Sequence, residues 1–307
     1  MTYVLAAPDT LDERGFESLV AGWSEAEGNR LLLDARHVRW VSPYGVLGML
    51  AVGSVARAYF GEAPLFQPPE NRNVASYLAR IGFFEHAAEI FELPGRIPRR
   101  AAKDSEGLLE VTAIRSHQDV HEVVDHVETR SATIIGKRLG YPPTAVLHFS
   151  MILSEVCQNI VEHAEGDGWV AAQTYNWKQR VGGVVVVIAV MDIGMGFRGS
   201  LAREHAQRFG ETWSDRKALE AAFLHGLSRF RDPGRGQGLQ GIRKQTSRWN
   251  GLCTIRSGTA QIAEVPDWID RAPIVSGLPD FPGAQIQVVL PEFVPPDENR
   301  RGGRRNA

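Results

Sequence analysis

The fold is decided by the stretch Leu153-Ser154-Glu155-Val156-Cys157-Gln158-Asn159-Ile160-Val161-Glu162-His163. Three polar side chains in it, Glu155, Asn159 and His163, follow one another at intervals of four residues. On a helix each such step turns the side chain by only about 40°, so the three form one polar stripe. The residues between them are mostly apolar and indicate the buried side of the same helix. A carboxylate and a carboxamide held beside a packed core predict a metal and phosphate site.

The composition is that of a globular protein with a sizeable core. The chain has 307 residues, 43% of them hydrophobic and 23% charged, and this length favours two domains. The net charge of −2 argues against direct binding of nucleic acid. The two cysteines, Cys157 and Cys253, lie in apolar runs and are expected to be buried and unpaired. No signal peptide is apparent, and the longest apolar run, residues 184–191, is too short to span a membrane, so we expect a cytoplasmic protein.

The first 96 residues alternate between short apolar runs and amphipathic stretches. In one of these stretches Phe16, Leu19, Val20 and Trp23 recur at helical spacing. The expected strands are residues 3–7, 31–34 (continued or bent by 38–41) and 63–66, and the expected helices are residues 12–27, 46–60 and 71–81. This alternation indicates a small α/β domain at residues 1–96.

Three pieces of this domain carry a family resemblance. They are the strand at 31–34 with 38–41, the turn Ser42-Pro43-Tyr44-Gly45 before a helix, and the segment at 74–84. Their order resembles the STAS domain, the fold of anti-sigma-factor antagonists. In regulated members of that family the turn reads approximately Asp-Ser-Ser-Gly and a serine accepts phosphate, whereas here Pro43 and Tyr44 fill the serine places. The resemblance implies a protein-interaction or dimerisation module, with Ser42 as an offset phosphate acceptor as the alternative.

A polar connector at residues 97–107 leads to a second α/β domain at residues 108–293. The expected strands there are residues 108–114, 169–175, 183–191, 252–256, 261–265 and 285–290, and the expected helices are 117–139 and 143–164. Residues 176–181 are typical of a polar, hairpin-like connection. The tail at 294–307 is rich in Pro, Asn and Arg and is expected to be disordered.

Two glycine motifs follow the opening stretch. The first, Asp192-Ile193-Gly194-Met195-Gly196-Phe197, places a carboxylate at a strand end, and its glycines let the backbone approach a flat ligand. Residues 197–233, with one expected helix at 215–225, are typical of a lid. The second motif, Gly234-Arg235-Gly236-Gln237-Gly238-Leu239-Gln240-Gly241, opens a helix whose free N–H groups suit an anion. It also matches a dinucleotide fingerprint, but no strand precedes it, and no P-loop motif occurs.

The three sites together resemble the gyrase, histidine-kinase and MutL ATPase superfamily (GHKL). Glu155-x3-Asn159-x3-His163 matches its N box, Asp192-x-Gly194-x-Gly196 its first glycine box, and residues 234–241 its second. Within the superfamily the chain looks most like the anti-sigma-factor serine kinases. The implied fold class is α/β: a STAS-like domain followed by an α/β-sandwich Bergerat domain.

The resemblance implies a role for each matching residue. Asn159 would bind Mg²⁺ through its amide oxygen, Asp192 would accept the adenine amino hydrogens, and Glu155 would be the general base or, alternatively, a surface carboxylate. His163 would contact the nucleotide or cap its own helix, and Arg235 would add charge to the phosphate site or be solvated. The remaining nucleotide contacts would come from the backbone of Gly194, Gly196, Gly236, Gly238 and Leu239.

One position departs from the family. A threonine usually helps to hold adenine where this sequence has Ala284, so one contact worth ~1 kcal/mol is expected to be lost. The resemblance implies an Mg·ATP-binding regulator that phosphorylates serine or threonine of an antagonist or sigma-factor-like protein partner. Two alternatives stay open: a non-catalytic, ATP-gated interaction switch, and a slow ATPase whose lid closes in a homodimer.

Overall fold

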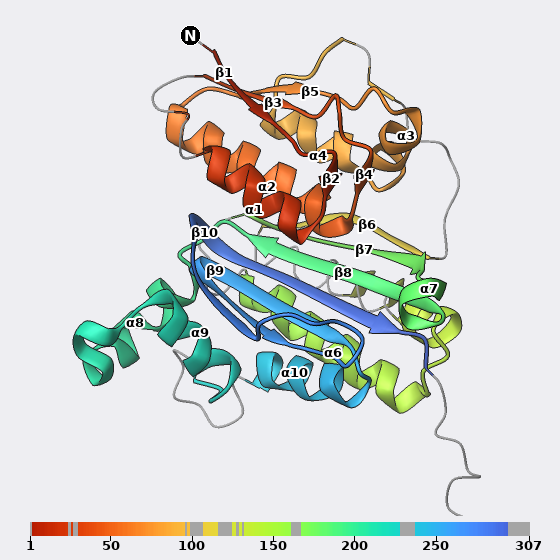
Figure 1. Cartoon of the computed structure of the whole chain (residues 1–307), viewed down its shortest axis with the longest axis vertical. Helices are drawn as coiled ribbons and strands as arrows, with labels where there is room; N and C mark the ends of the chain where they lie inside the picture. The colour runs from red at the N-terminus through yellow and green to blue at the C-terminus, as the bar shows by residue number, and fades with distance from the viewer. Residues whose placement is uncertain are drawn as a thin grey trace, which may run out of the picture.

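The computed structural model describes most of the chain as two α/β halves that pack against each other (Figure 1). The described residues are 2–23, 26, 30–95, 97–98, 107–115, 125–126, 129–130, 132–160, 167–227 and 237–293. Within them, none of the helices combines the length and apolar character needed to cross a lipid bilayer.

The N-terminal half contains two small parallel sheets. One has the order β1-β3-β5, formed by Thr2–Ala6, Arg30–Asp34 and Leu65–Gln67, and the other pairs β2 (Thr10–Leu11) with β4 (Trp40–Val41). The helices are α1 (Glu13–Trp23), α2 (Pro43–Phe60), α3 (Arg72–Arg80) and α4 (Phe83–Ile90). The α/β character expected for residues 1–96 is therefore confirmed.

Helix α2 has clear signals at both ends. Ser42 is its N-cap and accepts a hydrogen bond from the N–H of Gly45, while Pro43 occupies the first turn, where no N–H is needed. Gly61 ends the helix with a φ of 72°. The turn at residues 42–45 is thus the capped start of a helix, and most of α2 is buried.

The C-terminal half is built on a five-stranded antiparallel sheet with the order β6-β7-β8-β10-β9. Its strands are β6 (Leu108–Ile114), β7 (Gly168–Asn176), β8 (Val184–Asp192), β9 (Leu252–Glu264) and β10 (Ile274–Pro291). The other elements are η1 (Thr133–Arg138), α6 (Pro143–Asn159), α7 (Lys178–Val181), α8 (Gly196–Phe209), η3 (Gly210–Thr212), α9 (Asp215–Phe223) and α10 (Gln237–Arg248).

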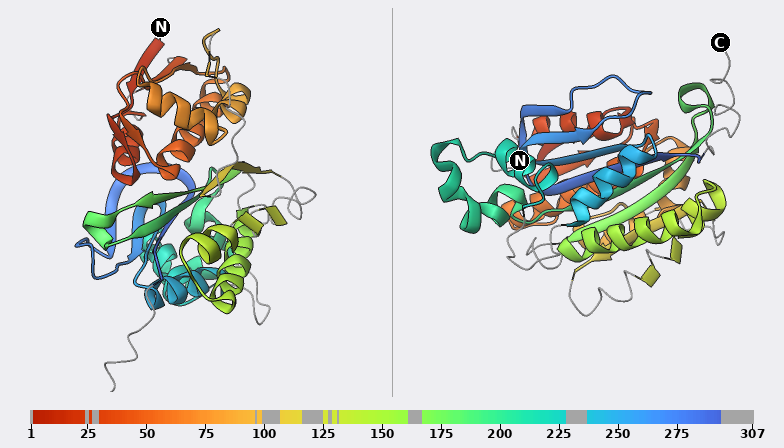
Figure 2. Two further views of the ribbon diagram at one scale, coloured as in Figure 1. Left: turned by 90° about the vertical axis from the view of Figure 1, so that its right-hand side faces the viewer. Right: turned by 90° about the horizontal axis from the view of Figure 1, so that it is seen from below.

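The sheet is covered on both faces. Helices α6 and α10 lie against one face, and α1 and α2 of the N-terminal half lie against the other (Figures 1 and 2). Strand alternation divides the residues accordingly. Val186, Ile188 and Val190 join the core beneath α6, whereas Ala189 and Met191 join the core of the N-terminal half. The two halves therefore share one apolar core, which the sequence did not reveal.

The cysteine prediction is confirmed. Cys157 and Cys253 are both buried and unpaired, and burial raises the pKa of the Cys157 thiol to about 12. A thiol with such a pKa stays protonated and acts as a small apolar group.

Several predicted boundaries were wrong in the C-terminal half. Residues 252–256 and 261–265 belong to the single strand β9, whose pairing with β10 resumes beyond an irregularity at Gly258, where φ is 58°. Strand β10 begins at Ile274, well before residue 285, and runs through two register irregularities. The segment 197–233 contains α8 as well as α9. Helix α8 buries only Leu201, so its sequence has no apolar stripe from which the helix could be predicted.

Other differences are smaller. Of the two alternatives for residues 38–41, the bend is confirmed and the continuation of β3 is wrong, because the Asp34 carboxylate accepts hydrogen bonds from Arg36 in a turn and β4 pairs with β2. Helix α4 was not expected, and the connection at 176–181 contains α7. The described part of the expected helix 117–139 ends in the π-helical η1. Residues 161–164 of the expected helix 143–164 and the tail 294–307 lie outside the described residues.

Candidate functional site

Residues 153–159 of the opening stretch form the last turns of α6, and the carboxylate of Glu155 reaches the start of α10. Oε1 of Glu155 accepts a hydrogen bond of 2.9 Å from the backbone N–H of Gly238. Gly238 lies in the first turn of α10, where N–H groups have no partner within the helix. The positive end of the helix dipole also favours a negative group there. The sequence-predicted carboxylate and second glycine motif are therefore in direct contact.

Two glycines allow α10 to approach α6 closely. A Cβ added to Gly238 would lie 2.9 Å from Cδ of Glu155, and one added to Gly241 would lie 3.0 Å from Cδ1 of Ile152. Both distances are shorter than normal van der Waals contact. Gly238 and Gly241 thus serve helix packing, which is a structural role besides the predicted contact with phosphate.

The C-terminal end of α6 lies beside the first glycine motif. A Cβ on Gly168 would lie 2.5 Å from Cγ2 of Ile160, the residue directly after Asn159. Gly168 pairs across the sheet with Asp192, the last residue of β8. The structure therefore brings the half-buried Asn159 and the strand end carrying Asp192 to the same region.

Asp192 is a buried carboxyl, 8% exposed. Burial raises its pKa from 3.8 to about 6, and hydrogen bonds from the backbone N–H groups of Gly194 and Ala284 oppose that shift. The N–H of Gly194 lies 2.9 Å from Oδ1 of Asp192. A carboxylate that is buried, yet held ionisable near neutral pH by backbone donors, suits a hydrogen bond to a polar ligand edge.

The backbone around Asp192 is tightly packed, and glycine is required there. Gly196 has a φ of 65°, and a Cβ on it would lie 2.6 Å from Oγ of Ser257. Gly283 has a φ of 79°, and its Cβ would lie 2.0 Å from the carbonyl oxygen of Asp192. The hydroxyl of Ser257 donates to the carbonyl of Gly283 at 2.7 Å and accepts from the N–H of Phe197 at 3.1 Å. This hydroxyl ties β9, β10 and the start of α8 together.

Of the four remaining predicted site residues, the structure describes one. Leu239 is half-buried and packs against the core beneath α6. His163, Arg235 and Gly236 lie outside the described residues, so their predicted roles stay predictions. Within the described segments, no group of three or more His, Cys, Asp or Glu side chains is placed to hold a metal ion.

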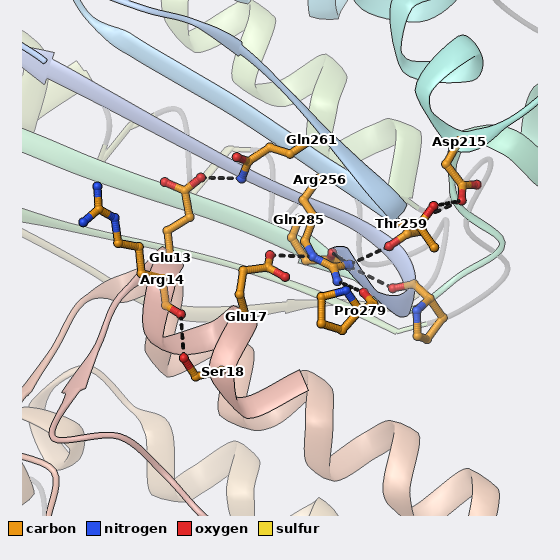
Figure 3. Close-up of polar contacts among 12 residues, drawn as sticks. Glu13, Arg14, Glu17, Ser18, Asp215, Arg256, Thr259, Gln261, Pro279 and Gln285 are labelled. Carbon is orange, nitrogen blue, oxygen red and sulfur yellow. Dashed lines mark hydrogen bonds and ion pairs between the residues drawn. The ribbon is translucent and has the colours of Figure 1, made fainter. Parts of the chain in front are cut away.

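A polar network that the sequence reasoning missed lies between the two halves (Figure 3). The carboxylate of Glu13 accepts hydrogen bonds from both terminal nitrogens of Arg271, at 2.9 and 3.0 Å, and from the amides of Gln261 and Gln287. These partners come from β9, β10 and the segment that joins them. One carboxylate of α1 therefore fixes the N-terminal half to the sheet.

Glu17, one turn further along α1, pairs with Arg256 at 2.7 Å. Arg256 is fully buried, and it also donates to the carbonyls of Gly258 and Pro279 and to the side chain of Gln285 (Figure 3). Burial is the largest effect on Glu17 and raises its pKa, and Arg256 opposes the rise. In the sequence, Glu13 and Glu17 lie on either side of Phe16 in one predicted helix, which could have indicated a polar contact. The sequence did not identify the partners of these two carboxylates.

Models of protein families and curated protein sequences were both compared with the chain, and neither comparison gave a match.

Proposed function

We propose that the chain is an Mg·ATP-binding regulator of the anti-sigma-kinase type, with a Bergerat-type nucleotide site in its C-terminal half and a STAS-like N-terminal half. The observation that carries this proposal is the contact between Glu155 and the N–H of Gly238. Two motifs meet there, at the start of a helix, through residues that are 83 positions apart in sequence. The neighbouring end of α6 lies over the strand end that carries Asp192.

The residues at this site suit a nucleotide. The N–H of Gly238 already binds an anionic oxygen, that of Glu155, so the start of α10 accepts negative charge. Asp192 offers a buried acceptor to an amino group, and Asn159 offers a half-buried amide oxygen, a ligand type that Mg²⁺ accepts. When bound, ATP would supply the phosphoryl group, and Mg²⁺ would neutralise part of the negative charge of the phosphates.

The residues of the chain would divide the work of binding and transfer. Asp192 would orient the adenine ring, with Gly194 holding its carboxylate. The N–H groups of the first turn of α10 that Glu155 leaves free would bind the phosphates. Glu155 would accept the proton of a serine or threonine hydroxyl on a protein partner. The oxygen of that hydroxyl would form the new bond to the γ-phosphorus while the bond from that phosphorus to the β-phosphate oxygen breaks and ADP leaves.

A second candidate is an ATP-gated interaction switch without chemistry, and the state of the N-terminal half favours it. Ser42 is 2% exposed, and its hydroxyl is engaged with Leu11 and Gly45. Tyr44 is fully buried against Phe16. This turn also lies on the sheet face opposite to α6 and α10 (Figure 1). This turn therefore offers no accessible hydroxyl for phosphoryl transfer within the chain.

Incubation of the full chain with γ-labelled ATP, with and without candidate antagonist proteins, tests the proposal. Label on the antagonist supports the kinase, free phosphate supports a slow ATPase, and retained intact ATP supports the switch. Glu155→Ala is expected to stop turnover while preserving nucleotide binding, and Asn159→Ala is expected to weaken Mg·ATP binding. Absence of ATP binding by the unaltered protein would overturn the proposal in all its forms.

A further inference from the structure

We infer that Glu17, Arg256 and Gln285 are positioning residues for Asp192, so that the N-terminal half sets the affinity of the adenine site. This inference rests on the proposed nucleotide site. It identifies a route of hydrogen bonds that begins on α1, crosses the sheet and ends at the backbone of Asp192.

Gln285 forms the last step of this route. Its side chain is fully buried, and its Nε2 donates to the carbonyl of Asp192 at 3.3 Å and to that of Pro282 at 2.8 Å. These two carbonyls flank the point where Gly283 touches the backbone of Asp192. The amide of Gln285 therefore joins the end of β8 to the part of β10 that closes over the Asp192 carboxyl.

Arg256 determines which way the Gln285 amide points. Nη1 of Arg256 donates to Oε1 of Gln285 at 3.2 Å. A guanidinium has only donors, so a reversed amide would place two donors against each other and turn an oxygen toward the carbonyls of Asp192 and Pro282, which would lose this donor. The orientation that serves Asp192 is thus selected by Arg256, which is its neighbour across the β9–β10 ladder.

Glu17 supplies the counter-charge for Arg256 from the other half of the protein. The exposed fraction of the Arg256 side chain is 0%, and its Nε lies 2.7 Å from Oε1 of Glu17. A guanidinium removed from water depends strongly on such a partner. Loss of the Glu17 carboxylate would allow the guanidinium to shift toward water, and its hydrogen bond to Gln285 would weaken.

Strand alternation explains how a contact on one face reaches a site on the other. Gln285 pairs directly with Met191, whose side chain joins the core of the N-terminal half. The next residue, Asp192, points its side chain to the opposite face. Its backbone carbonyl, which lies in the plane of the sheet, is the atom that Gln285 holds. Displacement of the Asp192 carbonyl would therefore also displace the carboxyl group of Asp192 and the hydrogen bond that this group accepts from the N–H of Gly194.

Three variants of the full chain test this inference: Glu17→Ala, Glu17→Gln and the matched control Glu13→Ala. Glu13 lies on the same helix, but its partners do not contact Asp192. The readouts are the Kd for Mg·ATP, measured by calorimetry, and amide hydrogen exchange at Gly194, measured without nucleotide. Glu17→Ala is expected to weaken binding about five- to tenfold and to accelerate exchange at Gly194 by a similar factor. Glu17→Gln keeps an oxygen acceptor for Arg256, so most of the Mg·ATP affinity and most of the protection from exchange at Gly194 are expected to be recovered. Glu13→Ala is expected to match the unaltered protein in both measurements.

A second pair of variants keeps the test valid if Glu17→Ala does not fold. Gln285→Met keeps the length of the side chain but lacks the amide, and it is expected to reproduce the loss. Where Glu17→Ala folds, adding it to Gln285→Met is expected to cause no further loss, because both act through one route. Equal Kd values and equal exchange rates in Gln285→Met and the unaltered protein would overturn the inference. If the unaltered protein binds no ATP, the proposed function fails. The exchange rates then decide the positioning role alone, with faster exchange supporting it and unchanged exchange overturning it.

Discussion

Replacement of Gly238 by alanine would act directly on the contact that carries the proposed function. The new Cβ would lie 2.9 Å from Cδ and 3.1 Å from Oε1 of Glu155. The backbone of α10 is fixed by its packing on α6, whereas the carboxylate is the end of a flexible side chain. The carboxylate is therefore expected to move, and its 2.9 Å hydrogen bond from the Gly238 N–H would break.

The size of the effect follows from two opposed contributions. A hydrogen bond to a charged acceptor contributes about 1.5–3 kcal/mol, and less here because Glu155 is only half-buried and water can replace the donor. Alanine in place of glycine favours the helix by about 0.5–1 kcal/mol. We therefore expect the free energy of unfolding to fall by about 1 kcal/mol. If Glu155 is the general base, turnover should fall about 10- to 100-fold because the base is misplaced.

Gly241→Ala is the matched control. It lies one turn further along α10 and would gain the same helix propensity, but its Cβ would meet the flexible Cδ1 of Ile152 at 3.0 Å and not a carboxylate. Urea denaturation should separate the two variants by about 1 kcal/mol, and labelled-ATP turnover should fall only in Gly238→Ala. Identical stability and identical turnover in the two variants would refute the assignment of Glu155 to this contact.

Three further predictions concern other parts of the structure. The pKa of Asp192 is raised to about 6 from an unfolded value of 3.8, so its contribution to stability is complete below pH 4 and is lost as the pH rises to about 6. Asp192→Asn should remove this loss, and denaturation at pH 4 and pH 7 should show the variant gaining ~2 kcal/mol relative to the unaltered protein between these values. Gly283→Ala should prevent native packing, since its Cβ would lie 2.0 Å from the Asp192 carbonyl, and near-ultraviolet circular dichroism would report this. Ser42→Ala should lower the free energy of unfolding by about 1 kcal/mol through loss of the α2 cap, whereas an unchanged value would argue against the capping role.

Local periodicity was sufficient to predict much of the C-terminal half. The apolar residues around Glu155 placed α6, and β6 was predicted with its observed bounds because it is bounded by polar residues. Asp192 was expected at a strand end and is the last residue of β8. Helix α8 was missed because it has almost no buried face, and a helix without an apolar stripe has no periodic signal.

By itself, the sequence determined which residues form the helix with Glu155 and Asn159, and that glycines flank Asp192. These features depend on spacing along the chain, which the backbone geometry of helices and strands translates directly into faces and ends. Only the tertiary structure decided that Glu17 would meet Arg256 and that the two halves would share a core. A polar side chain on a strand is compatible with water or with a buried partner, and its spacing is the same in both cases. The choice is made by the surface that packs against it, which here comes from a helix more than 200 residues away in sequence.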